Sequence, residues 1–117
     1  MKYMCLINLG ENARAWQSLP ADEQAKIGAA WAEFNTTPGL TPGNQLQPPE
    51  TATTVRVQDG RTLTTDGPFV ETKEALDGYF VLEADDLDAA IEVASKVPAV
   101  SMGGAVEVRP IVEWQRS

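Results

Sequence analysis

The chain has 117 residues, 43% of them apolar and 22% charged, which predicts a single globular domain over residues 1–117 and excludes a disordered chain or a coiled coil. Nine Lys and Arg against 17 Asp and Glu give a net charge of −8, so the basic stripe that nucleic acids or anionic lipids require is absent. No segment approaches the roughly 20 apolar residues of a membrane span, and we expect a cytoplasmic protein without membrane contact.

The sequence contains no histidine and one cysteine, Cys5. Nucleophile systems that need histidine, histidine-based zinc sites and thiolate clusters are therefore excluded. We predict no cofactor and no metal site. Cys5 lies within an apolar run and is expected to be a small core residue.

Residues 2–8 form an apolar run of large side chains, which predicts a central strand. Residues 19–35 follow with Pro20 near the first helical position and apolar side chains spaced three and four apart. The residues at this spacing are Ile27, Ala30, Trp31 and Phe34, and they predict an amphipathic helix that places Trp31 and Phe34 on the core. Gly28 either weakens this helix, by up to about 1 kcal/mol, or allows a close approach to the sheet.

Residues 36–50 contain two Pro-Gly pairs and a Pro-Pro pair, which exclude a helix or a central strand. We predict an ordered loop there, with a mobile linker as the alternative. Residues 51–66 predict a β-hairpin, because two β-branched runs flank Asp59-Gly60, the pair typical of a type I′ turn. The turn sets the register and places Thr53 opposite Asp66.

In this register Asp66 shares a face of the hairpin with Val55 and Val57. A carboxylate on an apolar face is a local inconsistency, and such inconsistencies often mark functional sites. Apolar surroundings would favour the protonated carboxyl group that general acid/base catalysis uses. We therefore predict Asp66 as the catalytic residue.

Residues 70–78 are predicted as a loop or a single turn, and residues 79–84 as a strand. Asp85 or Asp86 is expected to cap a helix that ends at Pro98 and packs one face on the core, comprising Leu87, Ala90, Ile91, Ala94 and Val97. A glycine turn over residues 101–104 leads to a last strand over residues 106–112. Pro110 places that strand at an edge or a bulge.

The predicted order is β-α-β-β-β-α-β. It indicates an α+β fold, a ferredoxin-like βαββαβ plan with an extra β-hairpin strand, whose antiparallel sheet carries helices on one face. The other face must be covered, and in a chain this small a second copy is the natural cover. We expect a homodimer.

Several separated motifs resemble the DGPF branch of the YCII-related domain family. Residues 66–69 read Asp-Gly-Pro-Phe, the motif of that branch, and residues 71–74 read Glu-Thr-Lys-Glu. Further similarities lie in residues 1–4, 46–49, 55–63 and 106–110. The resemblance implies a dimeric α/β barrel with a pocket near the sheet.

A related YCII-type protein is a dehydrochlorinase of a chlorinated hydroquinone with a proposed His-Asp pair, and DGPF domains occur fused to or encoded beside extracytoplasmic-function sigma factors. The resemblance implies binding of a small aromatic or anionic molecule near the turn at residues 66–69. The alternatives are a lyase or dehydrochlorinase-like enzyme that uses Asp66 as general acid/base, and an accessory module of a sigma factor. The histidine of the proposed pair has no counterpart in this chain.

Five further residues are candidates for ligand binding. Pro68 fixes the turn that aims Asp66, and Phe69 anchors it. Arg56, Lys73 and Arg109 would bind an anionic or phenolate ligand. The alternative interpretation is that residues 66–69 form a stiff structural turn and that the three cations are solvated surface charges.

Overall fold

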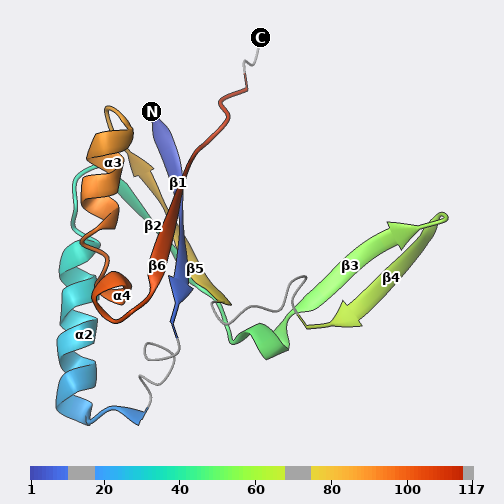
Figure 1. The fold of residues 1–117 in the computed structure, drawn as a ribbon, viewed down its shortest axis with the longest axis horizontal. Coiled ribbons are helices and arrows are strands. Elements are labelled where there is room, and N and C mark those ends of the chain that lie inside the picture. Colours follow the sequence, from blue (N-terminus) through green and yellow to red (C-terminus); the bar gives the residue numbers. More distant parts are fainter. Residues whose placement is uncertain (11–17, 68–74, 115–117) are drawn as a thin grey trace.

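The structure, a computed structural model, describes residues 1–10, 18–67 and 75–114. Four strands form an antiparallel sheet in the order β2-β5-β1-β6: β1 (Lys2–Leu9), β2 (Leu40–Gln45), β5 (Ala75–Glu83) and β6 (Ala105–Pro110). Three helices cover one face of this sheet, α2 (Ala21–Phe34), α3 (Leu87–Ala94) and α4 (Pro98–Ser101) (Figure 1). This is the ferredoxin-like strand order, so the predicted α+β fold is confirmed.

Strand β1 lies between β5 and β6, which confirms its predicted central position. Its side chains alternate, and those facing the helices are almost fully buried: Tyr3 is 1%, Cys5 0% and Ile7 5% exposed. The register pairs Cys5 with Phe80 of β5, so both side chains enter the same core. This layer between sheet and helices is the hydrophobic core of the described chain.

Helix α2 confirms the predicted helix and contributes its aromatic residues to that core. The rings of Phe34 and Phe80 make an edge-on contact with centroids 5.4 Å apart, and Trp31 meets Phe34 edge-on at 6.0 Å. Ala30, which has the same helical spacing, is exposed. Only a narrow stripe of α2 therefore packs on the sheet.

Strand β2 corrects the predicted loop and its linker alternative. The Pro-Gly pair that argued against a central strand is tolerated because β2 is an edge strand with a register shift between Pro42 and Asn44. A Cβ atom on Gly43 would overlap the carbonyl oxygen of Tyr79, so glycine lets β2 approach β5 closely. The next turn, η2 (Pro49–Thr51), leads out of this sheet.

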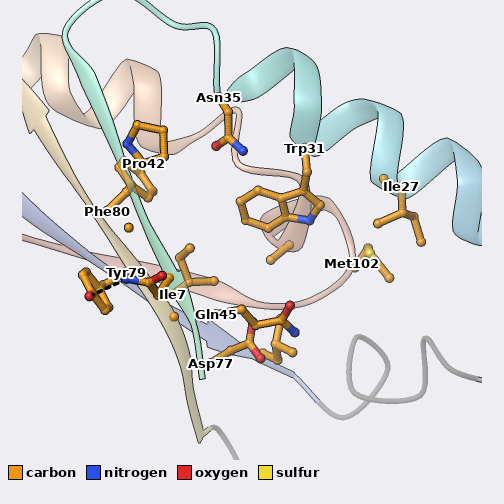
Figure 2. A pocket seen from close by; sticks show the side chains of 16 residues that line it. Ile7, Ile27, Trp31, Asn35, Pro42, Gln45, Asp77, Tyr79, Phe80 and Met102 are labelled. Carbon is orange, nitrogen blue, oxygen red and sulfur yellow. Dashed lines mark hydrogen bonds between the residues drawn. The ribbon is translucent and has the colours of Figure 1, made fainter. Parts of the chain in front are cut away.

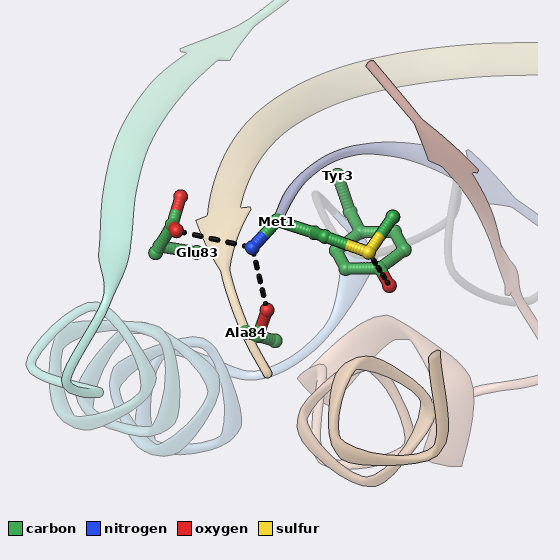
Figure 3. A network of polar contacts seen from close by, with 4 residues as sticks. All are labelled: Met1, Tyr3, Glu83 and Ala84. Carbon is green, nitrogen blue, oxygen red and sulfur yellow. Dashed lines mark hydrogen bonds and ion pairs between the residues drawn. The ribbon is translucent and has the colours of Figure 1, made fainter. Parts of the chain in front are cut away.

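Strand β5 begins at Ala75, four residues earlier than the predicted strand, so residues 75–78 are not a loop. At its other end β5 meets the start of β1 (Figure 3). The ammonium group of Met1 lies 3.1 Å from the Glu83 carboxylate and donates a 3.0 Å hydrogen bond to the Ala84 carbonyl oxygen. Because both charged groups are exposed, the ion pair contributes little stability.

Helix α3 begins where the sequence predicted, since the Asp86 side chain accepts a 2.8 Å hydrogen bond from the Ala89 amide. Of its predicted buried face, Leu87 and Ile91 are instead half exposed, because α3 lies at the margin of the sheet and only its Ala90 stripe is covered. The helix ends at Ala94, before the predicted Pro98, which begins α4. None of the helices within the described residues has the length and apolar character needed to span a membrane.

The predicted hairpin consists of β3 (Thr53–Gln58) and β4 (Arg61–Asp66), here called the arm. Its register is the predicted one, with Thr53 opposite Asp66, and Asp59 and Gly60 have the positive φ angles, 51° and 75°, of a type I′ turn. The arm does not extend the main sheet as an extra strand. It forms its own two-stranded sheet, which projects away from the rest of the chain (Figure 1).

Candidate functional site

A cavity of about 370 Å³ lies between α2 and the helix-covered face of the sheet (Figure 2). It is bounded by one face of α2, by residues of β1, β2 and β5, and by α4 with Met102. A cavity of about 150 Å³ already accommodates benzene, and small-molecule sites commonly measure about 300 to 1,000 Å³. The volume therefore suits a molecule of one or two rings.

The walls of this cavity are mainly apolar. The Trp31 indole extends from α2 toward the sheet, and Ile27 and Met102 lie beside it (Figure 2). Ile7 and Phe80 line the cavity from the sheet. Aromatic and aliphatic walls of this kind bind flat apolar ligands by contact and by exclusion of water.

Gly28 contributes to the width of the cavity. It lines the cavity from α2, and a Cβ atom built on it would have no neighbour within 4 Å. The predicted close approach of helix and sheet at this residue is therefore wrong. Glycine lowers the stability of the helix at this position. Because it has no side chain, the space next to Trp31 stays open.

Polar side chains also line the cavity: Asn35 at the C-terminal cap of α2, Gln45 on β2 and Asp77 on β5 (Figure 2). The register of β1 and β5 shifts at Asp77, and the Asp77 carbonyl oxygen accepts a hydrogen bond from the Leu46 amide, which ties β5 to the chain after β2. Two amides and a carboxylate provide both donors and acceptors for a ligand that carries hydroxyl groups.

Sequence reasoning missed the residues of this cavity, although a signal existed. Gly28, Trp31 and the C-cap residue Asn35 are spaced three and four apart and so lie on one side of α2 and its cap. A glycine and an amide beside a tryptophan on a core-facing stripe interrupt the apolar pattern. That interruption is what a cavity under a helix requires.

The predicted catalytic residue Asp66 ends β4 at the base of the arm. Its predicted neighbours Val55 and Val57 share its face, but they are 60% and 72% exposed, and Asp66 is exposed as well. The expectation of apolar burial is therefore wrong for the single chain, because the arm projects away from the main sheet and nothing among the described residues covers its valine side. The acid/base role of Asp66 stays a prediction.

The other predicted site residues are dispersed. Arg56 lies in the middle of β3 on the face opposite to Asp66, since it pairs with Leu63 while Asp66 pairs with Thr53. Arg109 is on β6, in the main sheet, where its register partner is Met4. Pro68, Phe69 and Lys73 lie outside the described residues.

Two residues that could carry chemistry are accounted for by packing. Burial in the core raises the pKa of the Cys5 thiol from 9.0 to about 11, so the thiol is protonated and behaves as the small core residue that the sequence predicts. The buried Tyr3 hydroxyl lies 3.7 Å from the Met1 sulfur. No group of three or more His, Cys, Asp or Glu converges as a metal site within residues 1–10, 18–67 and 75–114.

Comparison with known proteins gives two similarities along nearly the whole chain. The sequence model of the YCII-related domain matches residues 1–115. A protein of Rhizobium meliloti (strain 1021), described as uncharacterized, is 32% identical over 118 residues, which span 98% of this chain and 95% of that protein.

Proposed function

Because this chain belongs to the YCII-related domain family, we propose that it binds a small, neutral, hydroxylated aromatic molecule in the cavity between α2 and the sheet. The observation that carries the proposal is the 370 Å³ cavity between Trp31 and Phe80, which has apolar walls and a polar group of Asn35, Gln45 and Asp77. Apolar walls supply affinity, and a few convergent polar groups fix the orientation of a ligand.

The charges favour a neutral ligand over an anionic one. Asp77 lines the cavity, and the chain as a whole carries a net charge of −8. An anion would meet repulsion from both, whereas the hydroxyl group of a phenol can donate to a carboxylate or an amide oxygen. Of the aromatic and anionic ligands that the resemblance left open, these charges support the aromatic one.

The proposal is for binding, not for a reaction. Among the cavity-lining residues in the described part of the chain, Asp77 is the one carboxylate, and none is a lysine or an arginine. General acid/base catalysis commonly uses a pair of titratable groups with different pKa values. Asp77 has no such second carboxylate, lysine or arginine beside it among the described residues that line the cavity.

Calorimetric titration with hydroquinone and 4-chlorophenol tests the proposal, with benzoate as the anionic probe. Ligand binding to the folded state should also raise the melting temperature. We expect both phenols to bind and benzoate to bind at least tenfold more weakly. If neither phenol binds at millimolar concentration, or if benzoate binds best, the proposal is wrong.

A variant that fills the cavity locates the binding site. In Gly28→Leu the new side chain enters the open space next to Trp31, and we expect at least tenfold weaker phenol binding. Ala29→Leu is the matched control, because it adds the same side chain at the next residue, which is exposed and does not line the cavity. Equal losses of binding in the two variants would contradict the assignment of this cavity.

A further inference from the structure

A second hollow, here called the outer hollow, adjoins the cavity along α2. It lies between the first half of α2 and the turn after α4, and it is more open to solvent than the cavity. Leu19 gives it an apolar wall, and the exposed side chains of Glu23, Lys26 and Ser101 also line it. An apolar wall next to exposed polar groups suits the end of a ligand that reaches water.

The cavity and the outer hollow share two apolar side chains, Ile27 of α2 and Met102 after α4. Both side chains are half-buried. They lie beside each other on one side of the Trp31 indole, whereas Asn35 lies on its other side (Figure 2). Ile27 and Met102 therefore separate the cavity from the outer hollow.

The backbone at Met102 is fixed, whereas its side chain can adopt several rotamers. The amides of Met102 and Gly104 donate hydrogen bonds of 3.1 and 2.8 Å to the carbonyl oxygen of Ala99. A Cβ atom on Gly104 would lie 2.7 Å from the Asn8 carbonyl oxygen, so this turn is packed closely against β1. A methionine side chain is unbranched and adapts its shape to its neighbours. The passage between Ile27 and Met102 can therefore open by a change of rotamer, without movement of the backbone.

The space along α2 is longer than a single ring. Asn35 and Ile27 are eight residues apart and so about 12 Å apart along the helix axis, and Glu23 lies about 6 Å further. Benzene fits a cavity of about 150 Å³, so a phenol ring alone leaves much of the 370 Å³ cavity empty. A hydroxyl group bound at Asn35 directs the opposite position of its ring past Trp31 toward Ile27.

We infer that the ligand is a phenol with a linear apolar chain opposite its hydroxyl group. The inference rests on the proposed function: the ring occupies the cavity, and the chain passes between Ile27 and Met102 and ends at Leu19 in the outer hollow. A branched chain is too wide for this passage unless both side chains move aside. Glu23 and Lys26 carry opposite charges, so the outer hollow suits an uncharged chain end.

Calorimetric titration with linear 4-alkylphenols tests the inference. We expect the affinity to rise about two- to fourfold for each CH2 group from 4-ethylphenol to 4-hexylphenol, because each group leaves water for an apolar path. We expect 4-tert-butylphenol, which has as many carbon atoms as 4-butylphenol, to bind at least tenfold more weakly than the linear isomer. An affinity that falls with chain length, or equal affinities for the two butylphenols, overturns the inference. Hydroquinone is titrated beside them: if it binds and the chain brings no gain, this inference alone is wrong, and if no phenol binds, the proposed function is wrong as well.

A variant in the outer hollow locates the end of the chain. Leu19→Gln changes a side chain that lines the outer hollow and not the cavity. We expect 4-hexylphenol to bind at least threefold more weakly to this variant, and hydroquinone, which has no chain, to bind within about twofold of the wild type. Leu87→Gln is the matched control, because Leu87 is 48% exposed at the start of α3 and lines neither hollow. Equal affinities of the two variants for 4-hexylphenol overturn the inference.

Isotope-filtered nuclear Overhauser spectra of 4-hexylphenol with labelled wild-type protein locate the chain without a substitution. We expect cross-peaks from the ring protons to the Trp31 indole, from the middle of the chain to the Met102 methyl group, and from the terminal methyl group to the methyl groups of Leu19. Cross-peaks of the terminal methyl group with Trp31 or Phe80 in place of Leu19 would show that the chain folds back into the cavity, and they overturn the inference.

Discussion

Strand β1 and the arm show how much of a β structure is encoded locally. β1 is a continuous apolar run, β3 of the arm has valines at alternate positions, and both have the predicted strand structure. In β1 the alternate residues Tyr3, Cys5 and Ile7 are at most 5% exposed, whereas Val55 and Val57 of the arm are at least 60% exposed. The strand pattern and the turn determine strand pairing and register. Whether another layer covers a face of the strands depends on tertiary packing and not on this local pattern.

The largest expected effect lies in the core. Phe80→Ala should lower the free energy of unfolding by about 3 to 5 kcal/mol, because it removes a ring that is 3% exposed and packs against Phe34. Leu63→Ala in the arm is the comparison and should cost less than about 1 kcal/mol. Urea denaturation measures both values, and similar losses would mean that the arm is packed as tightly as the main sheet.

This contrast also explains which parts of the fold the sequence predicts. The central strand, α2, the start of α3 and the hairpin register depend on local signals, namely periodicity, the Asp86 cap and the Asp59-Gly60 turn, and all were predicted correctly. Strand β2 was missed because Pro42 and Gly43 usually interrupt strands. An edge position with a bulge tolerates both, and only the assembled sheet reveals that β2 is at the edge.

The candidate site was harder to predict for the same reason. The predicted register, which places Asp66 on one face with Val55 and Val57, is correct. The predicted burial of that face is wrong in the single chain, because burial depends on a covering layer that the local sequence does not specify. Gly28 was predicted either to weaken its helix or to allow a close approach to the sheet, and not to line a cavity. Its contribution to the cavity depends on the distance between α2 and the sheet, which is a tertiary property.

The second prediction concerns the pH dependence of the core. The pKa of Cys5 is raised from 9.0 to about 11 by burial, so the folded state retains a proton that the unfolded state loses. This stabilisation is fully present below pH 9.0 and is lost as the pH rises through about 11, a loss of roughly 2 to 3 kcal/mol. Urea denaturation of wild type and Cys5→Ala at each pH isolates this thiol, because all other groups titrate in both proteins. Parallel stability curves for the two proteins between pH 9 and 11 would contradict the burial of Cys5.

The third prediction concerns the turn of the arm. Gly60 has φ 75°, so Gly60→Val should destabilise the arm by more than about 1 kcal/mol, because a β-branched side chain is strained there. Hydrogen exchange should become faster in the arm amides and stay unchanged in β1 and β5. Gly60→Asn, which tolerates positive φ, is the control. Equal protection of the arm in Gly60→Val and wild type would show that the turn does not hold the hairpin.

The fourth prediction separates helix stability from cavity width at Gly28. Gly28→Ala should raise the free energy of unfolding by about 0.5 to 1 kcal/mol, since alanine favours the helix and its Cβ meets no neighbour within 4 Å. Ala29→Gly should lower it by a similar amount. Thermal unfolding of both variants measures this, and a loss of stability in Gly28→Ala would mean that the space beside Gly28 is already occupied.

The smallest effect on stability is expected for Asp66→Asn, which distinguishes the two candidate sites. Asp66 is exposed and does not line the cavity, so the free energy of unfolding should change by less than about 0.5 kcal/mol. Hydroquinone binding, measured by calorimetry, should stay within about twofold of the wild type, whereas Gly28→Leu should weaken it at least tenfold. The reverse result, with binding lost in Asp66→Asn and retained in Gly28→Leu, would place the ligand at the base of the arm. A carboxylate that is exposed in the single chain could act as an acid or base at the arm only if a layer from outside the chain covered it and excluded water. Whether the arm is covered in solution therefore bears on the choice between the two candidate sites.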